Sequence, residues 1–354
     1  MEKKLQMSEK RIVYISNLRI FACLGVILCH VAAMDWFDNI WDRSWIIMTI
    51  YNVCSRFCVP VFVMISGALF LNPEKEIRLK KLYLSNILKL CIFLMFWGIF
   101  YQIYYLVVFA DMPIPAAVIQ GGYNVLTGDT QTHLWYIYML IGLYLIVPVL
   151  KPCIDHLKKR QIEYFLILWM ILNVLTVTIS VINIPLLQII SMYIGRFSVN
   201  IVEGYVGYFV LGHYLNAYEI PEKIRKICYA AGVAAVMACS VLTVLYSRSI
   251  NSPSELFMDY RNIFVALWSI SIFLFFQKHF NQLQTKWLDW IAKCTMGIYG
   301  VHVFFIFEMR RREIDTTIFN NIVSIPFLVI VIFLCSLLVV SLIRLIPLFR
   351  KWIT

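Results

Sequence analysis

The sequence predicts an all-α polytopic membrane protein, built as a single bundle of about ten transmembrane helices. Of its 354 residues, 61% are hydrophobic and only 14% are charged, and the mean hydropathy is +0.79. A soluble domain has no use for so much apolar surface, so soluble fold classes are excluded. We find no internal repeat, low-complexity tract or appended soluble domain, and we expect one integral-membrane domain over residues 1–354.

The third observation behind this prediction is the succession of apolar runs. Each run reaches or approaches the roughly 20 residues with which a helix crosses a bilayer. The first follows a Lys- and Glu-rich segment without a small-residue cleavage site, so we interpret it as a retained helix and not as a signal peptide. The expected spans cover residues 12–34, 44–71, 80–110, 132–150, 162–183, 197–216, 227–247, 260–277, 287–309 and 321–348.

The net charge of +11 does not indicate a nucleic-acid partner, because of how the charges are distributed. Lys and Arg gather in short clusters between the apolar runs, as the positive-inside rule describes. If both termini are cytoplasmic, about 19 of these residues lie inside and about six outside, so we expect that orientation. The ten cysteines lie mostly within apolar runs and lack zinc-binding spacing, so we expect core packing and no metal site.

Arg19 and His30 are the first candidate functional residues. They lie eleven positions apart in the first span, close to three helical turns, so their side chains share a face about 16 Å apart along the axis. Ionisable residues inside a membrane helix are costly and by default suggest a functional site. The alternative is that Arg19 reaches the nearer interface and His30 caps a neighbouring helix. The pair alone leaves both interpretations open.

Arg56 is the next candidate, about a dozen residues from the outer end of the second span. That depth prevents easy contact with the interface, so we expect Arg56 to face a cavity or a carboxylate. Pro60 and the small residues Ser66 and Gly67 follow in the same span. They favour a kink and a close approach to another helix.

Later spans contain further polar candidates. His133 would lie at the outer interface with Trp135 and Tyr136, where it could bind a sugar hydroxyl or simply belong to an aromatic belt. Glu203 lies in the sixth span and His302 in the ninth. A single membrane histidine is more often a packing group than a catalyst, but several His and Arg residues in one bundle favour a polar cavity.

Two outer segments have open interpretations. Arg310, Arg311 and Arg312 break the positive-inside pattern, because they follow the ninth span on the outer side. They could bind an anionic substrate or a lipid head group, or they could be a tolerated charge cluster beside nearby carboxylates. The second outer loop, about 111–131, has no Lys or Arg. It could cover a polar acceptor or merely connect two spans.

Four motifs follow one another along nearly the whole chain. They are Arg19 with His30 after ten further residues, the run Arg56-Phe57-Cys58-Val59-Pro60-Val61-Phe62-Val63-Met64-Ile65-Ser66-Gly67, the run His133-Leu134-Trp135-Tyr136-Ile137-Tyr138 with Gly142-Leu143-Tyr144 and Pro148, and Gly297-Ile298-Tyr299 with His302. In this order they resemble the membrane-bound acyltransferase family called acyltransferase 3. The chain is similar to its short O-acetyltransferases that modify surface polysaccharides, and it also looks like the membrane domain of certain serine racemases of glycopeptide resistance.

The resemblance implies transfer of an acyl group, usually acetyl, from cytoplasmic acetyl-CoA to a hydroxyl of a cell-surface glycan or lipid-linked saccharide at the outer face of a bacterial-type plasma membrane. It implies that Arg19 and His30 are catalytic. It also implies no tightly bound cofactor, and acyl-CoA, the saccharide and the bilayer as partners. The substrate-binding residues that we expect are Arg56, His133, Trp135, Tyr136, His302, Glu203, Arg78, Lys81 and Lys89.

One departure from the family concerns the donor site. The family often has an Arg-x-x-Arg motif near the cytoplasmic start of the third span, thought to meet the CoA phosphates. Here its nearest equivalents are Arg78 with Lys81, or Lys89. Lysine holds a phosphate as a point charge but lacks the bidentate fork of arginine.

The mechanism that we expect divides the work between Arg19 and His30. Arg19, toward the cytoplasm, would hold the donor or polarise its thioester. His30 would act as general base on the acceptor hydroxyl, because an imidazole with an unperturbed pKa of about 6.5 suits proton transfer at neutral pH. An acyl-imidazole on His30 is the alternative chemistry.

A secondary transporter or a lipid or glycan flippase is the alternative function, since ten spans with buried charges would suit it too. However, matching halves with paired, Gly- or Pro-interrupted segments are not apparent. A sensory membrane module is a third, less favoured class.

Overall fold

The computed structural model describes residues 2–182, 184–196, 204–283 and 285–354, with side chains from residue 13 onward. All regular secondary structure in this part of the chain is helical. The first half contains α1 (Glu2–Ala32), α2 (Arg43–Ser55), α3 (Cys58–Phe70), α4 (Leu79–Lys81), α5 (Leu88–Val108), α6 (Ile114–Leu126), α7 (Trp135–His156), α8 (Lys159–Trp169) and α9 (Thr176–Ser180). Wider π-helical segments, Leu82–Ile87 and Met170–Leu175, join α4 to α5 and α8 to α9.

The second half continues with α10 (Pro185–Gly195), α11 (Val206–Ala217), α12 (Glu222–Ser249), α13 (Ile263–His279), α14 (Lys286–Arg311), α15 (Asn321–Ile343) and α16 (Pro347–Trp352). Among the described residues, nine helices are long and apolar enough to cross a membrane. The predicted fold class, an all-α polytopic membrane protein, is therefore confirmed. Of the ten expected spans, the sixth, 197–216, begins in residues outside the described part, and its described part forms α11.

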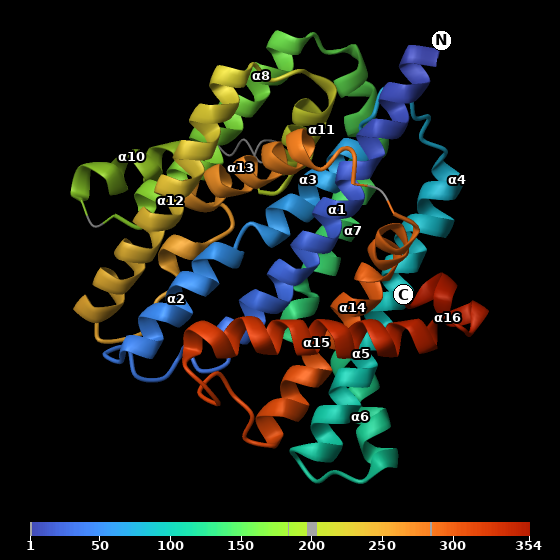
Figure 1. The fold of residues 1–354 in the computed structure, drawn as a ribbon, viewed down its shortest axis with the longest axis vertical. Helices are drawn as coiled ribbons and strands as arrows, with labels where there is room; N and C mark the ends of the chain where they lie inside the picture. The colour runs from blue at the N-terminus through green and yellow to red at the C-terminus, as the bar shows by residue number, and fades with distance from the viewer. Residues whose placement is uncertain (1, 183, 197–203, 284) are drawn as a thin grey trace.

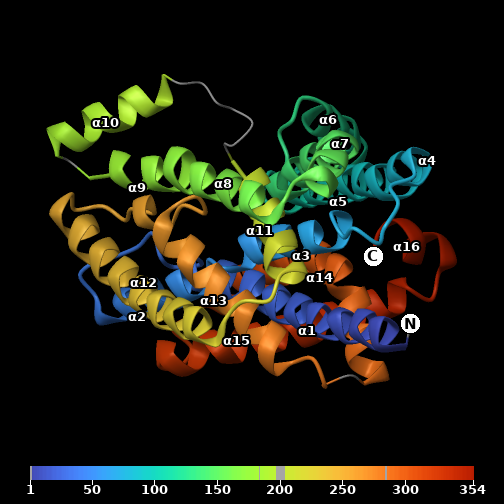
Figure 2. The same cartoon turned by 90° about the horizontal axis from the view of Figure 1, so that it is seen from above.

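Helix α1 lies at the centre of the bundle. It packs against α2, α3, α13, α14 and α15 (Figures 1 and 2). Its side chains Tyr14, Leu18, Ala22, Ile27 and Val31 have no exposed surface. Because α1 is surrounded by other helices, the polar side chains that it carries can face protein interior instead of lipid.

The second expected span, 44–71, is interrupted at Arg56 and Phe57. There α2 ends and α3 begins. Pro60 lies in the first turn of α3, where its missing N–H leaves the carbonyl of residue 56 without a helical partner. The kink expected from Pro60 is thus present, and it lies beside Arg56.

Helices α3 and α11 touch through their backbones. A Cβ added to Gly67 would lie 1.8 Å from the carbonyl oxygen of Phe209, and one added to Gly212 would lie 2.0 Å from that of Met64. Each helix thus uses a glycine where the other presents backbone, as small residues do in membrane helix pairs. The close approach expected at Ser66 and Gly67 is therefore confirmed.

The outer surface of the bundle is apolar, as a lipid solvent requires. Helix α15 shows this most clearly, because Ile330, Leu334, Leu338 and Leu342 recur every fourth residue and are all exposed. That spacing makes one continuous stripe along the helix. The opposite face buries small polar groups such as Ser336 inside the protein, so the amphipathic pattern is inverted relative to a soluble helix.

The segment at about 111–131, for which the sequence predicts an outer loop, includes a helix. It contains α6, which packs back against α5 (Figure 1). The amide of Gln102 on α5 donates to the carbonyl of Asp129 at 2.7 Å and accepts from Asn124 at 3.0 Å. These bonds hold the α6 hairpin at one end of α5.

The close contact of α3 with α11 can be tested with Gly67→Ala. The added methyl would overlap the carbonyl of Phe209, so we expect the two helices to separate. The loss in stability should be about 1–3 kcal/mol, the usual cost of overpacking. A thermal melt of the detergent-solubilised protein, followed by size-exclusion chromatography, measures it.

Gly142→Ala is the matched control. No neighbouring atom lies within 4 Å of a Cβ at Gly142, and alanine is the better helix former, so this variant should melt at or above the wild-type temperature. Equal melting temperatures for the two variants would contradict the packing described above.

Candidate active site

Arg19 lines a cavity of about 270 Å³ between α1, α3, α5, α7 and α14. Lys89 and Lys293 line the same cavity, and none of its described lining residues is acidic. Arg19 makes no ion pair within the described part of the chain. We call this space the basic cavity. Three cationic side chains with no acidic side chain among them suit the cavity to an anion or to the oxygen of a polarised carbonyl.

The two lysines mark the end of the basic cavity at which α5 and α14 begin. Lys89 Nζ donates to the backbone carbonyl of Thr354 at 2.8 Å. Arg344 Nη1 donates to the backbone carbonyl of Lys293 at 3.1 Å and to Thr354 Oγ1 at 3.2 Å. Thr354 therefore forms part of the cavity wall, and Arg344 adds a fourth cationic group nearby.

His30, His133 and His302 come from α1, the turn before α7, and α14, and they form one cluster. Their ring centroids are separated by 5.2 Å (His30 to His302), 5.7 Å (His133 to His302) and 6.3 Å (His30 to His133). We call them the histidine cluster. His133 and His302 are buried, whereas His30 is half-buried. The structure thus brings together the three histidines that the sequence singled out.

The hydrogen bonds of His302 define its tautomer. Its Nδ1 lies 2.8 Å from the carbonyl oxygen of Tyr299 and 3.2 Å from that of Ile298. A carbonyl only accepts, so Nδ1 carries the hydrogen and Nε2 presents a lone pair. In the described part of the chain, the Nε2 atoms of His302 and His133 are buried without a hydrogen-bond partner. A buried polar atom without a hydrogen-bond partner is energetically costly, so we expect both nitrogens to form a hydrogen bond with a further group.

Tyr299 joins the histidine cluster to the basic cavity. It lines the cavity, and its ring centroid lies 5.7 Å from that of His133 and 5.8 Å from that of His302. Its hydroxyl donates to the backbone carbonyl of His133. Tyr136 also lines the cavity and lies 5.8 Å from Tyr299, centroid to centroid. The inner wall of the basic cavity is therefore in contact with the histidine cluster.

The structure describes no metal centre at this site. Among the described residues, no group of three or more His, Cys, Asp or Glu side chains is arranged to hold a metal ion. The imidazoles can instead donate, accept or transfer protons.

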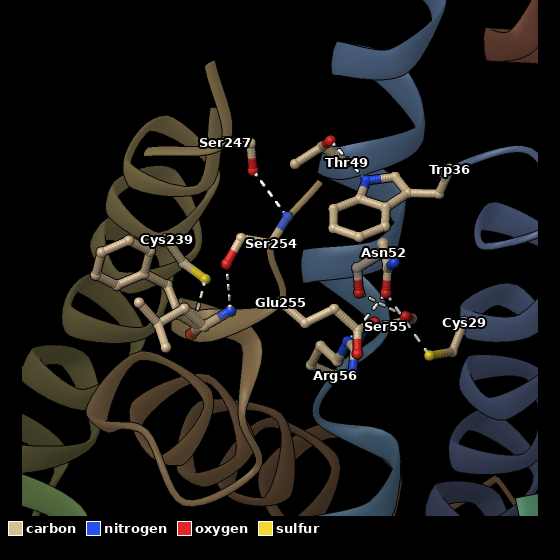
Figure 3. A network of polar contacts seen from close by, with 12 residues as sticks. Cys29, Trp36, Thr49, Asn52, Ser55, Arg56, Cys239, Ser247, Ser254 and Glu255 are labelled. Carbon is tan, nitrogen blue, oxygen red and sulfur yellow. Dashed lines mark hydrogen bonds and ion pairs between the residues drawn. The ribbon is translucent and has the colours of Figure 1, made fainter. Parts of the chain in front are cut away.

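Arg56 lies in a network of polar contacts between α2, α1 and the loop that carries Glu255 (Figure 3). Its Nη2 is 2.5 Å from Glu255 Oε1, and its Nε donates to Asn52 Oδ1 at 2.9 Å. The same amide oxygen accepts from Cys29 Sγ at 3.7 Å, and Cys29 directly precedes His30. The carboxylate expected opposite Arg56 is thus that of Glu255. The network ties α2 to the part of α1 that carries His30.

Trp135 and Tyr136 are adjacent in sequence but face different groups. Tyr136 faces the basic cavity, as described above. Trp135 packs with Tyr260 and Tyr205, at centroid distances of 5.7 Å and 5.8 Å. The Arg56 guanidinium also lies 5.7 Å from the Tyr260 ring, so Trp135 belongs to the surroundings of Arg56 and not to the cavity.

The three donor-site candidates lie in two cavities. Lys89 lines the basic cavity, whereas Arg78 and Lys81 line a separate one of about 230 Å³. Arg78 is exposed and pairs with Glu76 at 3.5 Å. The remaining candidate, Glu203, lies outside the described residues.

Sequence reasoning missed three residues of this site. Glu255 lies in a loop far from Arg56 in sequence, although a buried arginine in a membrane protein requires such a partner. Lys293 lies inside the ninth expected span, 287–309, where a lysine is unusual enough to have been noticed. Asn52 had a clear signal, because it precedes Arg56 by one helical turn.

The comparison with known proteins identifies the family of the chain. The family model of acyltransferase family 3, described as an acyltransferase domain, matches residues 12–341. Comparison with curated proteins and with solved structures gives no significant match. The match spans all four motifs and every helix from α1 to α15, and this chain belongs to acyltransferase family 3.

Proposed function

We propose that this protein transfers an acetyl group, or another short acyl group, from CoA to a saccharide hydroxyl on the opposite side of the membrane. The observation that carries the proposal is the position of the histidine cluster against the inner wall of the basic cavity. One compartment is suited to an anionic thioester donor, and the other to proton transfer. Family membership favours acyl transfer over the transporter and flippase alternative.

The donor would enter from the lysine-rich end of the basic cavity. Lys89 and Lys293 lie there, near the starts of α5 and α14, and the clusters of basic residues that precede these helices favour a cytoplasmic location. The cavity is too small for a whole CoA, so it would take the acyl-pantetheine arm and leave the nucleotide at its entrance. Arg19, deeper along α1, would hold the pantetheine arm by hydrogen bonds.

The reaction itself needs a base within hydrogen-bond reach of the acceptor hydroxyl. His30 would accept the proton of the acceptor hydroxyl as its oxygen attacks the thioester carbon. Arg19 lies about 16 Å from His30 along α1, so it would hold the donor in the basic cavity and would not contact the reacting carbonyl. The carbon–sulfur bond then breaks, the acyl ester leaves with the acceptor, and the proton passes to the CoA thiolate.

His133 and His302 would support this step. The unpaired Nε2 of His302 can accept a hydrogen bond from His30 or from the acceptor hydroxyl. An acyl-imidazole on His30 is a second route to the same products. It predicts a covalent acetyl group on His30 after incubation with acetyl-CoA alone, and mass spectrometry of rapidly quenched protein distinguishes the two routes.

His30→Ala removes the proposed base. We expect acyl transfer from acetyl-CoA to a saccharide acceptor to fall by at least about 100-fold, the lower range for general base catalysis. The measurement is release of free CoA by purified protein in nanodiscs, with and without a surface-glycan fraction. A melting curve checks that the variant folds.

His156→Ala is the control, because His156 is an exposed histidine at the end of α7, outside the cluster. It should turn over as the wild type does. Near-normal turnover by His30→Ala would contradict the assignment of His30 as the base. If neither the wild type nor His156→Ala released CoA with any acceptor, this result would count against acyl transfer.

Lys89→Ala and Lys293→Ala test the donor site. Each variant removes a positive charge from the basic cavity, so we expect the KM for acetyl-CoA to rise about tenfold with a smaller change in kcat. Lys80→Ala is the control, since Lys80 is exposed and lines neither the basic cavity nor the cavity of Arg78. An unchanged KM in both test variants would place the donor elsewhere.

A further inference from the structure

A groove of about 420 Å³ lies at the opposite end of α5 and α14 from the basic cavity. It is lined by Tyr105, Phe109, Gln131, Phe307, Arg310 and Arg311. On α14, Arg310 follows His302 by eight positions, about 12 Å along the axis. We call it the arginine groove. It lies beyond the histidine cluster, on the side from which an acceptor would have to come.

The charges around the groove are not balanced. Glu308 accepts hydrogen bonds from Tyr104 at 2.5 Å, from Arg311 at 2.9 Å and from Arg312 at 3.3 Å. Arg311 and Arg312 are therefore paired with a carboxylate, as expected if they belong to a tolerated charge cluster. Arg310 has no ion pair in the described part of the chain and is exposed. Its guanidinium is therefore available to an anion from outside the protein.

The walls of the groove suit a sugar ring. Tyr105 and Phe109 are 49% and 48% exposed, so their rings offer apolar surface to the C–H face of a saccharide, and the Gln131 amide can bond its hydroxyls. A membrane-interface belt also explains exposed Tyr and Phe. It does not explain an unpaired arginine on the side of the membrane where arginine is otherwise scarce.

Aromatic contacts join the groove to the histidine cluster. The ring of Phe307 lies 6.2 Å from that of Tyr101, and the ring of Tyr101 lies 5.1 Å from that of His133. Gln131, in the groove, precedes His133 by two residues. A saccharide held in the groove would thus be a near neighbour of the cluster.

We propose that the arginine groove is the acceptor subsite and that Arg310 binds an oxyanion of the acceptor saccharide. The inference rests on the proposed function, which it deepens by naming an anionic acceptor. The oxyanion can be the carboxylate of an acidic sugar or the phosphate of a lipid-linked saccharide. Both present two or more acceptor oxygens to the planar guanidinium.

Direct binding tests the proposal without any acyl donor. The protein in phosphatidylcholine nanodiscs would be titrated with an oligogalacturonate, with the methyl ester of that oligomer, and with a polyprenyl-phosphate-linked disaccharide. We expect the wild type to bind at least one of the two anionic probes at least tenfold more tightly than the methyl ester. Arg310→Gln should weaken that binding about tenfold. Preference for one anionic probe identifies the carboxylate or the phosphate as the source.

Arg43→Gln is the matched control, because Arg43 is also exposed, lies at the start of α2 and does not line the groove. It should bind both anionic probes as the wild type does. The proposal is overturned if neither anionic probe binds, if the methyl ester binds equally well, or if Arg310→Gln binds unchanged. Arg310-dependent binding by a protein that never releases CoA would instead count against the proposed reaction and leave the subsite standing.

Discussion

The structure depends on the burial of ionisable side chains on one helix in a bundle whose solvent is lipid. Arg19 and His30 on α1 could not face hydrocarbon without a large cost. Packing of α2, α3, α13, α14 and α15 around α1 gives both residues an interior environment. Arg19 then faces a cavity, and His30 faces two other histidines. The same constraint accounts for the Arg56–Glu255 pair, since a buried guanidinium is stabilised by a nearby carboxylate.

Helices α5 and α14 connect the basic cavity, the histidine cluster and the arginine groove. Lys89 lies in the first turn of α5. Lys293 lies two turns into α14, His302 lies further along the same helix, and Arg310 lies in its last turn. The basic cavity, the histidine cluster and the arginine groove therefore follow one another along the same two helices. In the reaction that we propose, a donor and an acceptor from opposite sides meet at the cluster without either of them crossing the membrane.

Much of the fold could be predicted from the sequence, because the signal is strong and local. A run of apolar residues long enough to cross a bilayer must form a helix, since lipid offers the backbone no other hydrogen-bond partner. The Pro60 kink and the close approach at Gly67 could also be predicted, as they depend on what those two residues lack. The π-helical turn before α5 and the α6 hairpin could not, because they depend on contacts with other segments.

By itself, the sequence determined that the chain is a helical membrane bundle and that Arg19 and His30 share one face of its first helix, because hydropathy and helical periodicity are local properties. It also singled out His133 and His302, but as separate residues. Only the tertiary structure decided that the ring centroids of these histidines lie within 6.3 Å of that of His30. It also decided that Glu255 pairs with Arg56, and that Lys89 but not Arg78 shares a cavity with Arg19. Such pairings join helices far apart in the chain, and they depend on how the helices rotate and pack against one another, which no local pattern specifies.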